Sequence, residues 1–590
     1  MMKITGAKVL TTVLEQAGIS VISGIPGHSV GDFALAVGES GAFTSILARH
    51  ESTSAFAADV YYRISGRLMV AFTHAFPGAG NALTAVANAY ADYSSLFFVA
   101  GNTASVSIGR GGYQELSRQI NDDLTQLIRP TVKRVWQPRT AADIASNALA
   151  ALREAKSGRP GPVALNVSQE IWSQEVDAPS SLELAKFTFD VRPRPDCESV
   201  ERTAALLAGA KRPVILVGNG VNMGRARSEL KAMVELLGMP VATTASGKGG
   251  FPENHRLSVG VVGWTGSGTA NEATRSADVI LVLGARLSEA TASSWVHDAT
   301  FSPKTRIIQA DIDLTGIANV YPVAEALIGD LRATLADLTS AMKGRKGADL
   351  SPWHEHLKQA RSVWEQTAVA SQVLGSVGAI GTGAVVQALR KSIDGPINLV
   401  NDCGKHHKWI VQQFEAREDD YVISSMGGAS MGIGLGGAIG AALARPEATT
   451  VAWVGDGGLA MSLAALPTIA EYRLPIIVVV IDDAAYGVVR NTQMAQVGRT
   501  SFSVFDGSGT NPDYRLDFTA VAKGCGIPGR TVADPAQLDA AFAWAKEQEG
   551  PCVLTILSDI GSIHPAGGGV LRPLDATSRS LVWAHDRGVA

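Results

Sequence analysis

Residues 449–487, TTVAWVGDGGLAMSLAALPTIAEYRLPIIVVVIDDAAYG, contain a glycine turn between two strongly apolar runs. The stretch is typical of a buried strand, a turn, a helix and a second buried strand. A right-handed crossover of this kind places the carboxyl ends of two parallel strands next to each other. Asp456 ends the first run and Asp483 ends the second, so we expect these two carboxylates to lie close together.

Gly455, Gly457 and Gly458 surround the first of these aspartates. Glycines at such a turn let the backbone pass close to a ligand and leave a helix N-terminus facing an anion. Two carboxylates beside that helix start favour a hard divalent cation that holds phosphate, and Mg²⁺ fits best. A GDG turn alone would indicate only solvated aspartates. The complete strand–helix–strand unit between Asp456 and Asp483 favours the metal site instead.

Short Val/Ile/Leu runs alternate with alanine-rich helical stretches along the rest of the chain, which indicates parallel α/β architecture. The runs fall into three blocks. We therefore predict three doubly wound parallel-sheet domains, at residues 1–180, 195–345 and 370–560, followed by a tail at 561–590. Ligands should bind at the carboxyl ends of the strands.

The composition excludes several classes of protein. A net charge of -4 gives no reason to expect nucleic acid or an anionic membrane as a partner. The longest apolar runs, such as residues 476–481, are far too short for a membrane span, and the N-terminus lacks the apolar core of a signal peptide. The four cysteines have no metal-binding spacing and suit a reducing compartment. We expect a cytoplasmic protein.

A second segment, ILARHESTSAFAADVYYRISGR at residues 46–67, places Glu51 in the first turn of an expected small-residue helix. Alone, Glu51 is most simply a glutamate that the helix dipole favours. Together with the GDG unit, however, the segment resembles the thiamine-diphosphate-dependent enzymes. In that family the glutamate hydrogen-bonds the aminopyrimidine ring of the cofactor and drives deprotonation of its thiazolium carbon, so the resemblance implies this role for Glu51.

The resemblance also implies the cofactors, thiamine diphosphate and Mg²⁺. The metal ligands would be Asp456, Asp483 and the carbonyl of Ala485, with Asp483 at a position where the family more often has Asn. The three blocks would be pyrimidine-binding, central and diphosphate-binding domains. Because the family's cofactor spans two subunits, a homodimer is the minimum assembly, and a homotetramer is expected.

Segments at residues 74–102, 401–409 and 424–443 extend the resemblance, most closely to acetolactate synthase. Met431 matches the bulky residue that supports the bent cofactor; without its flanking glycines it would be read as a core residue. The implied cofactor-binding residues are Pro26, Gly27, Asn81, Lys405, His406, Gly428, Ser430, Met431, Gly455, Gly457, Gly458, Tyr486 and Gly487.

Three further side chains are candidates for the chemistry. Gln114 matches a glutamine that lines the acetolactate synthase site. His74 aligns with a histidine of benzoylformate decarboxylase, and His28 lies on a similar turn after a strand. A lone turn histidine is usually structural, but two in one crevice favour acid–base function. We therefore predict Glu51, His74, His28 and Gln114 as catalytic residues.

The resemblance implies a carboligase that decarboxylates a 2-oxo acid and transfers the acyl carbanion to a second carbonyl, as acetolactate synthase does. Thr492 stands roughly where the anabolic synthases have a large tryptophan, which indicates a wider substrate pocket. The alternatives are a 2-oxo acid decarboxylase or aldehyde lyase (benzoylformate decarboxylase or benzaldehyde lyase type), a 2-hydroxyacyl-CoA lyase and a non-catalytic homologue.

The central block leaves its own ligand open. In acetolactate synthases this domain often carries a non-redox FAD, and in acyl-CoA relatives a nucleotide. Here the segment after Arg286, LSEATA, lacks the acidic pair and arginine common in the FAD-binding synthases. A domain with FAD and a domain with no ligand are both consistent with this sequence.

Overall fold

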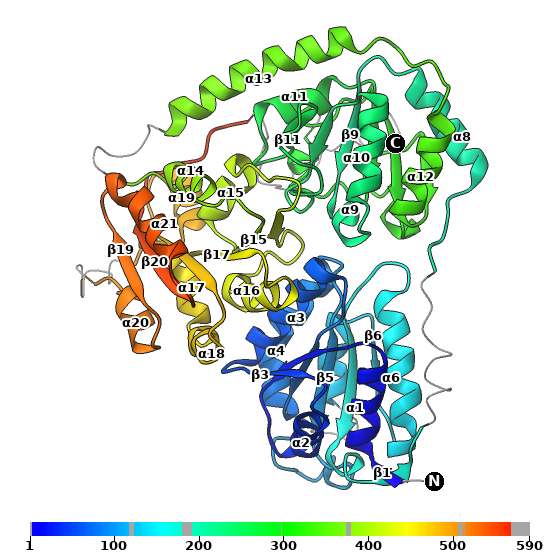
Figure 1. The fold of residues 1–590 in the computed structure, drawn as a ribbon, viewed down its shortest axis with the longest axis vertical. Helices are drawn as coiled ribbons and strands as arrows, with labels where there is room; N and C mark the ends of the chain where they lie inside the picture. Colours follow the sequence, from blue (N-terminus) through cyan, green and yellow to red (C-terminus); the bar gives the residue numbers. More distant parts are fainter. Residues whose placement is uncertain are drawn as a thin grey trace.

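The computed structural model describes residues 3–116, 123–179, 191–296, 298–372, 379–505, 511 and 514–567. In these residues the strands form three six-stranded sheets and one two-stranded sheet, and the three large sheets are parallel throughout (Figure 1). The predicted fold class, three parallel-sheet α/β domains, is therefore confirmed.

The first domain has the strand order β3-β2-β4-β5-β7-β6. Its inner strands are buried along their whole length because helices cover both faces of the sheet. Its strands are β2 (Val21–Gly24), β3 (Thr44–Leu47), β4 (Val70–Thr73), β5 (Phe97–Asn102), β6 (Arg134–Trp136) and β7 (Val163–Ser168), with an antiparallel pair β1 (Lys3–Thr5) and β8 (Glu175–Asp177). Its helices are α1 (Gly6–Gln16), α2 (Gly31–Ser40), α3 (Glu51–Ser65), α4 (Ala75–Ala91), α5 (Asp123–Ile128) and α6 (Ala141–Lys156).

The central domain has the order β11-β10-β9-β12-β13-β14 and lies at the top of Figure 1. The long helix α13 (Ser351–Gln372) runs along its outer side toward the third domain. The strands are β9 (Pro213–Val217), β10 (Val241–Thr243), β11 (Ser258–Val261), β12 (Val279–Leu283), β13 (Arg306–Asp311) and β14 (Glu325–Ile328). The other helices are α8 (Cys197–Ala208), α9 (Asn219–Met223), α10 (Arg227–Leu237), α11 (Gly268–Ser276) and α12 (Leu331–Met342).

The third domain has the order β16-β15-β17-β18-β20-β19. Residues 449–487 form the expected unit, although two helices, α17 and α18, connect its strands rather than one. The strands are β15 (Ile397–Asn401), β16 (Tyr421–Ser424), β17 (Thr449–Gly455), β18 (Ile476–Asp482), β19 (Gly529–Val532) and β20 (Cys552–Leu557). The helices are α14 (Thr382–Ser392), α15 (Lys405–Gln413), α16 (Ile433–Ala444), α17 (Asp456–Ser462), α18 (Ala465–Glu471), α19 (Gly487–Val497), α20 (Phe518–Gly524) and α21 (Leu538–Lys546).

Helices α3 and α16 join the first and third domains across one continuous hydrophobic core (Figure 1). Gly436 and Gly440 on α16 allow this close approach. A β-carbon at Gly436 would lie 2.9 Å from Phe56 Cβ, and one at Gly440 would overlap the carbonyl oxygen of Ala57. The helix that begins at Glu51 is thereby fixed against the diphosphate-side domain of the same chain.

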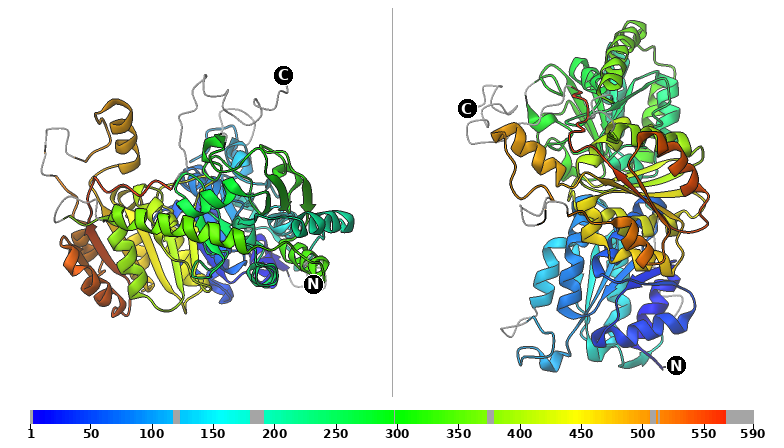
Figure 2. Two further views of the ribbon diagram at one scale, coloured as in Figure 1. Left: turned by 90° about the horizontal axis from the view of Figure 1, so that it is seen from above. Right: turned by 90° about the vertical axis from the view of Figure 1, so that its left-hand side faces the viewer.

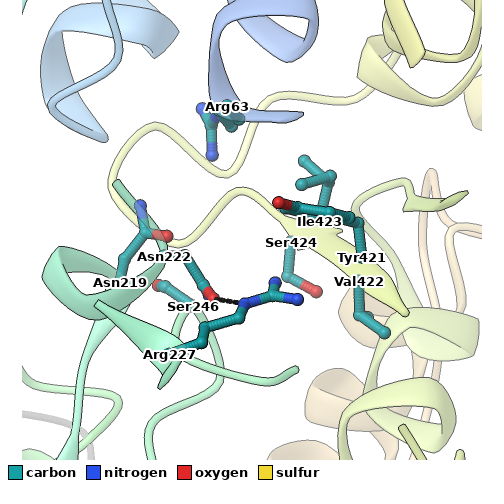
Figure 3. A pocket seen from close by; sticks show the side chains of 9 residues that line it. All are labelled: Arg63, Asn219, Asn222, Arg227, Ser246, Tyr421, Val422, Ile423 and Ser424. Atoms are coloured by element: carbon teal, nitrogen blue, oxygen red, sulfur yellow. Dashed lines mark hydrogen bonds between the residues drawn. The ribbon is translucent and has the colours of Figure 1, made fainter. Parts of the chain in front are cut away.

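The central domain contacts both of the others at a compact junction (Figure 3). Arg225 donates to the carbonyl oxygens of Tyr62, Arg63 and Ile64 at the end of α3, where a cation complements the helix dipole. One pocket at this junction has a volume of only about 10 Å³, room for about one water molecule. It is lined by Arg63, Asn219, Asn222, Arg227, Ser246, Tyr421, Val422, Ile423 and Ser424.

Figure 1 shows the three domains in a triangular arrangement, and the right-hand view of Figure 2 shows the third domain at a height between the central and first domains. Within the described ranges, no helix is both long and apolar enough to cross a bilayer.

Candidate active site

The two predicted metal-binding aspartates lie at the same edge of the third sheet. Strands β17 and β18 pair in parallel with Gly455 opposite Ile481, so Asp456 and Asp483 follow neighbouring strand ends. Both carboxylates are buried. The backbone N–H of Ala485 donates to Asp456 Oδ2 at 3.2 Å, which brings all three predicted ligand residues together.

Lys405, the first residue of α15, is the cation nearest to this pair. Its Nζ lies 2.6 Å from Asp483 Oδ2, and both side chains are almost completely buried. The same Nζ donates to the carbonyl oxygens of Asp559 and Ile560 at 3.2 and 3.1 Å. The three donors of the ammonium group are therefore directed at protein acceptors, and Lys405 acts here as the counter-ion of Asp483.

The buried carboxylates carry more negative charge than one lysine balances. Burial, and then the neighbouring Asp483, raise the pKa of Asp456 to about 8. Burial also raises the pKa of Asp483, while Lys405 opposes that shift. A divalent cation would favour the ionised form of both groups. Among the described residues, no cluster of three or more His, Cys, Asp or Glu side chains could hold a metal, so any metal here would depend on two carboxylates and a carbonyl.

Several buried side-chain nitrogens of α15 have no hydrogen-bond partner among the described residues. They are His406 Nε2, His407 Nε2 and Trp409 Nε1, and His406 is the one that lies against the GDG turn at Gly455. Burial, the largest cause, lowers its pKa to about 3. A buried polar atom without a partner is costly, so His406 Nε2 fits a ligand atom that the protein itself does not supply. The donor set thus fits a metal-bound diphosphate.

The glycines of this region are required partly by the protein's own side chains. A β-carbon at Gly455 would lie 2.8 Å from His406 Cε1, and one at Gly457 would lie 2.7 Å from Tyr486 Cε1. Gly487 would bring a β-carbon within 3.0 Å of Asp483 Oδ2. The sequence analysis assigned these glycines to close contact between backbone and ligand. The structure shows that they also make room for side chains of the third domain itself.

Asp402 is a residue of this site that the sequence analysis missed. It follows β15 as Asp456 follows β17, and this position at a strand end was the available signal. Its carboxylate accepts from the backbone N–H of Gly432 at 2.9 Å, beside Met431. Burial raises the pKa of Asp402 to about 7. Hydrogen bonds from the backbone N–H groups of Cys403 and of residues 432–434 act in the opposite direction and lower that pKa. Asp402 thus anchors the start of α16.

Met431 lies next to the GDG turn. Met431 is half-buried, and its Cε would lie 3.4 Å from a β-carbon placed on Gly457. Gly428 and Ser430 precede it in the same loop, where the N–H of Ser430 points at Asn88 Oδ1 at 3.4 Å. Met431, Gly457 and Tyr486 therefore share one corner of the site.

Glu51 is the first residue of α3, and α4 holds its carboxylate. Asn81 Nδ2 donates to Glu51 Oε2 at 3.0 Å. A β-carbon at Gly78 would lie 3.1 Å from Glu51 Oε1, so the glycine leaves room for the carboxylate. Glu51 is half-buried at the edge of the first sheet. The structure thus brings together Glu51 and Asn81, which the sequence had placed on separate segments.

His74, His28 and Gln114 also come together. His74 Nδ1 lies 2.8 Å from Ser29 Oγ, and its Nε2 is hydrogen-bonded to Gln114 Oε1. The rings of His28 and His74 meet edge to face with centroids 4.5 Å apart. Burial and then His74 lower the pKa of His28. Because Gln114 Oε1 can only accept, His74 carries its proton on Nε2, and Nδ1 accepts from Ser29.

The remaining candidates of this domain lie on the turn after β2. A β-carbon at Gly27 would overlap the ring of His74, while Pro26 is exposed. Among the described residues, no hydrogen bond or ion pair joins Glu51, His74 or Gln114 to Asp456, Asp483 or Lys405. The predicted residues therefore fall into two groups, one on each outer domain, which we call the two half-sites.

A larger cavity, of about 1170 Å³, lies where the three domains meet. It opens between β9 and β12, where the strand order of the central sheet reverses, a position that binds ligands in open α/β sheets. Arg286, on the wall of this cavity, donates to the hydroxyl of Tyr93 at 3.0 Å. The guanidinium groups of Arg286 and of Arg159, from the first domain, both lie over the Tyr93 ring.

Comparisons with known proteins agree with this arrangement. The chain matches the N-terminal TPP binding domain of thiamine pyrophosphate enzymes at residues 4–122, their central domain at 200–338 and their C-terminal TPP binding domain at 402–556. It is 30% identical to the acetolactate synthase large subunit of Parasynechococcus marenigrum over 562 residues, 94% of this chain and 87% of that protein. It is 29% identical to the probable acetolactate synthase large subunit of Methanocaldococcus jannaschii, over 95% of this chain and 93% of that protein. Isozyme 3 of Escherichia coli is also 29% identical, over 92% of each chain.

The chain therefore belongs to the thiamine-diphosphate-dependent enzymes of the acetolactate synthase type. This confirms thiamine diphosphate as the cofactor and an enzyme of carbon–carbon bond chemistry as the class. The comparisons do not favour the decarboxylase, lyase or non-catalytic alternatives.

Proposed function

We propose that this enzyme decarboxylates a 2-oxo acid and transfers the acyl carbanion to a second carbonyl compound, as its relatives' name, acetolactate synthase, describes. The observation that carries the proposal is the presence of both half-sites in one chain. Glu51 is held by Asn81, and Asp456 and Asp483 share one strand edge beside Lys405. Thiamine diphosphate supplies the acidic carbon and the electron sink.

Glu51 and its neighbours handle the first proton. In the proposed role, the Glu51 carboxyl exchanges a proton with the aminopyrimidine ring, and Asn81 fixes the orientation of the carboxylate through Oε2. His74, His28 and Gln114 serve the later proton transfers. Gln114 and Ser29 hold the His74 ring from both nitrogens, so the ring presents a defined tautomer.

Asp456, Asp483 and the Ala485 carbonyl would hold Mg²⁺ in the proposed site, since oxygen ligands suit that ion. His406 and the start of α17 would face the diphosphate. The supporting observation is His406 Nε2, which has no hydrogen-bond partner among the described residues. Gly428, Ser430, Met431, Tyr486 and Gly487 would line the remaining cofactor wall. Lys405 neutralises Asp483 and keeps the carboxylate in place before the metal binds.

Asp483→Ala is expected to weaken the retention of Mg²⁺ and of thiamine diphosphate together, because one oxygen ligand is lost. Retention of both after dialysis against a chelator would be measured by mass spectrometry of the released cofactor and metal. The matched control is Asp483→Asn, which keeps an oxygen ligand and should retain the cofactor better. Unchanged retention in the alanine variant would place the metal elsewhere.

We further propose that a second copy of the chain completes the site, as a homodimer at minimum and a homotetramer in the full assembly. The separation of the two half-sites supports this. So do apolar side chains left exposed next to them: Tyr113 beside His28, with 77% of its surface exposed, and Val489 and Val497 on α19, with 49% and 65%. We place the enzyme in the cytoplasm, which suits its four free cysteines.

One incubation series tests the reaction. The enzyme with thiamine diphosphate and Mg²⁺ would receive pyruvate, aromatic 2-oxo acids, acyloins and 2-hydroxyacyl-CoAs, and products would be identified by mass. We expect release of CO₂ from a 2-oxo acid and a condensation product of two carbonyl units. Aldehyde as the sole product would favour a decarboxylase or lyase, and cofactor binding with no turnover of any substrate would contradict the proposal.

The purified enzyme is expected to be colourless or to carry FAD well below one per chain, because the segment after Arg286 lacks the flavin pattern. The cavity beside Arg286 is large enough for a nucleotide, so its volume does not decide the question. The measurement is the visible absorbance spectrum of the denatured protein against protein concentration. A stoichiometric flavin spectrum would contradict this prediction.

A further inference from the structure

A buried polar contact joins the end of α4 to the loop before α16, residues 425–431. Asp92, which follows α4, accepts hydrogen bonds from Ser425 Oγ at 2.5 Å and from the backbone N–H of Gly427 at 2.6 Å. The N–H of Met426 points at the same carboxylate at 3.3 Å. One carboxylate of the first domain thus holds the first three residues of the 425–431 loop.

The loop has little freedom to lie elsewhere. A β-carbon at Gly427 would overlap the Ala91 carbonyl, and one at Gly428 would overlap Asn88 Oδ1. Asn88 Oδ1, one turn before Asp92 on α4, lies 2.7 Å from the same Ser425 Oγ, so Asp92 and Asn88 share the one proton of that hydroxyl. The loop backbone therefore lies directly on the last turns of α4, with space for no side chain between them.

Asp92 is also part of a buried charge network. Arg63 donates to both oxygens of Asp59, at 2.7 and 2.8 Å, and to Asp92 Oδ2 at 3.0 Å. All three side chains are at most 4% exposed. Figure 3 shows Arg63 reaching from α3 toward the segment that follows β16. Asp59 and Asp92 thus share one cation, but only Asp92 touches the 425–431 loop.

We propose that Asp92 is a positioning residue for thiamine diphosphate. It acts through the 425–431 loop, which ends at Met431 beside Gly457 and Tyr486. The loop is seated from its first residues by Asp92 and at its end by Asp402, so Met431 is fixed from both sides. This inference rests on the proposed function, in which Met431 contacts the cofactor.

Asp92→Asn is the central variant, because an amide cannot replace this carboxylate in either orientation. One orientation sets its NH₂ group against Arg63 Nη2, and the other sets it against the N–H groups of Met426 and Gly427. Asp59→Asn is the control for charge, because it creates the same conflict with Arg63 and leaves every loop bond of Asp92 in place. Asp59 Oδ2 also accepts from Asn88 Nδ2 at 3.2 Å, so the amide oxygen of the variant must keep that bond for the control to hold. Ser425→Ala is the converse, because it removes a loop bond and leaves the charges unchanged.

The readouts are the Kd of thiamine diphosphate at saturating Mg²⁺, by isothermal titration calorimetry, and the Tm without cofactor. We expect Asp92→Asn to raise the Kd about ten-fold or more, as loss of an outer-shell partner commonly does. Ser425→Ala should raise it about five-fold with a small change in Tm. Asp59→Asn should lower the Tm and leave the Kd within about two-fold.

Equal shifts of Kd in Asp59→Asn and Asp92→Asn would overturn the proposal, because both would then act through stability alone. An unchanged Kd in Ser425→Ala would also overturn it, and this variant remains informative if the aspartate variants fail to fold. A wild-type enzyme that binds no thiamine diphosphate would instead contradict the proposed function, so the two failures are distinguishable.

Discussion

Glu51→Gln is expected to bind thiamine diphosphate normally and to lose about 10²–10⁴-fold in turnover, the usual value of a positioned proton-transfer group. The amide can still accept the hydrogen bond of Asn81 through its oxygen, so the start of α3 should keep its structure. It cannot exchange a proton with the aminopyrimidine ring. Activation of the cofactor should therefore fail while its binding persists.

Three measurements separate these effects. Calorimetry gives the affinity for thiamine diphosphate, hydrogen–deuterium exchange at the thiazolium carbon gives the activation step, and product formation gives turnover. We expect exchange and turnover to fall together. Turnover within about two-fold of wild type would remove Glu51 from the mechanism, because a positioned proton-transfer group contributes a far larger factor to the rate.

His74→Ala is expected to cut turnover by about 10²-fold or more while leaving thiazolium exchange near the wild-type rate. His74 follows β4 at the carboxyl end of the first sheet, where ligands bind. Its Nδ1 is held by Ser29 and its Nε2 by Gln114, which fixes the orientation of the ring. In the acid–base role, Nε2 exchanges Gln114 for the reacting atom. An alanine removes the only side chain type that titrates near neutrality unperturbed.

The other role for His74 is packing, because the backbone of Gly27 lies directly against the ring. A packing role would lower the Tm of the alanine variant and leave the rate per folded enzyme unchanged. Ser29→Ala is a useful companion, since it keeps the ring and removes the hydroxyl partner of Nδ1, while the backbone N–H of Ser29 still points at that nitrogen. A folded His74→Ala enzyme with full activity would leave the carboligase function standing and His74 without a chemical role.

Several features of the site could be predicted from the sequence because they are local. The strand–helix–strand unit at residues 449–487 sets Asp456 and Asp483 on adjacent strand ends, since the hand of the crossover leaves little choice. Glu51 falls at the start of α3 because an acidic residue precedes a long run of helix-forming small residues. Apolar runs without alternation predicted parallel sheets covered on both faces, and all three sheets have them.

Other features depend on how distant segments pack, and no pattern along the chain contains that information. Lys405 was expected to face an anion, yet its donors are directed at Asp483 and at two carbonyls that follow β20. Asn81 was expected at the cofactor, and its amide donates to Glu51, a contact that the sequence did not indicate. Asp402 and Asp92 were not singled out at all, because an aspartate after a strand or helix is common and only its neighbours give it a role.

The sequence by itself therefore determined the fold class and the family, because strand periodicity and motif spacing are properties of short segments. The residues proposed to carry the chemistry also came from those motifs. Only the tertiary structure decided which of these residues share a half-site, which buried charges neutralise each other, and how the 425–431 loop is seated on α4. Some of those contacts join distant segments of one domain, such as Lys405 with Asp483, and others join two domains, such as Asp92 with the 425–431 loop. Their geometry depends on the packing of whole helices and sheets, as in the close approach of α3 and α16.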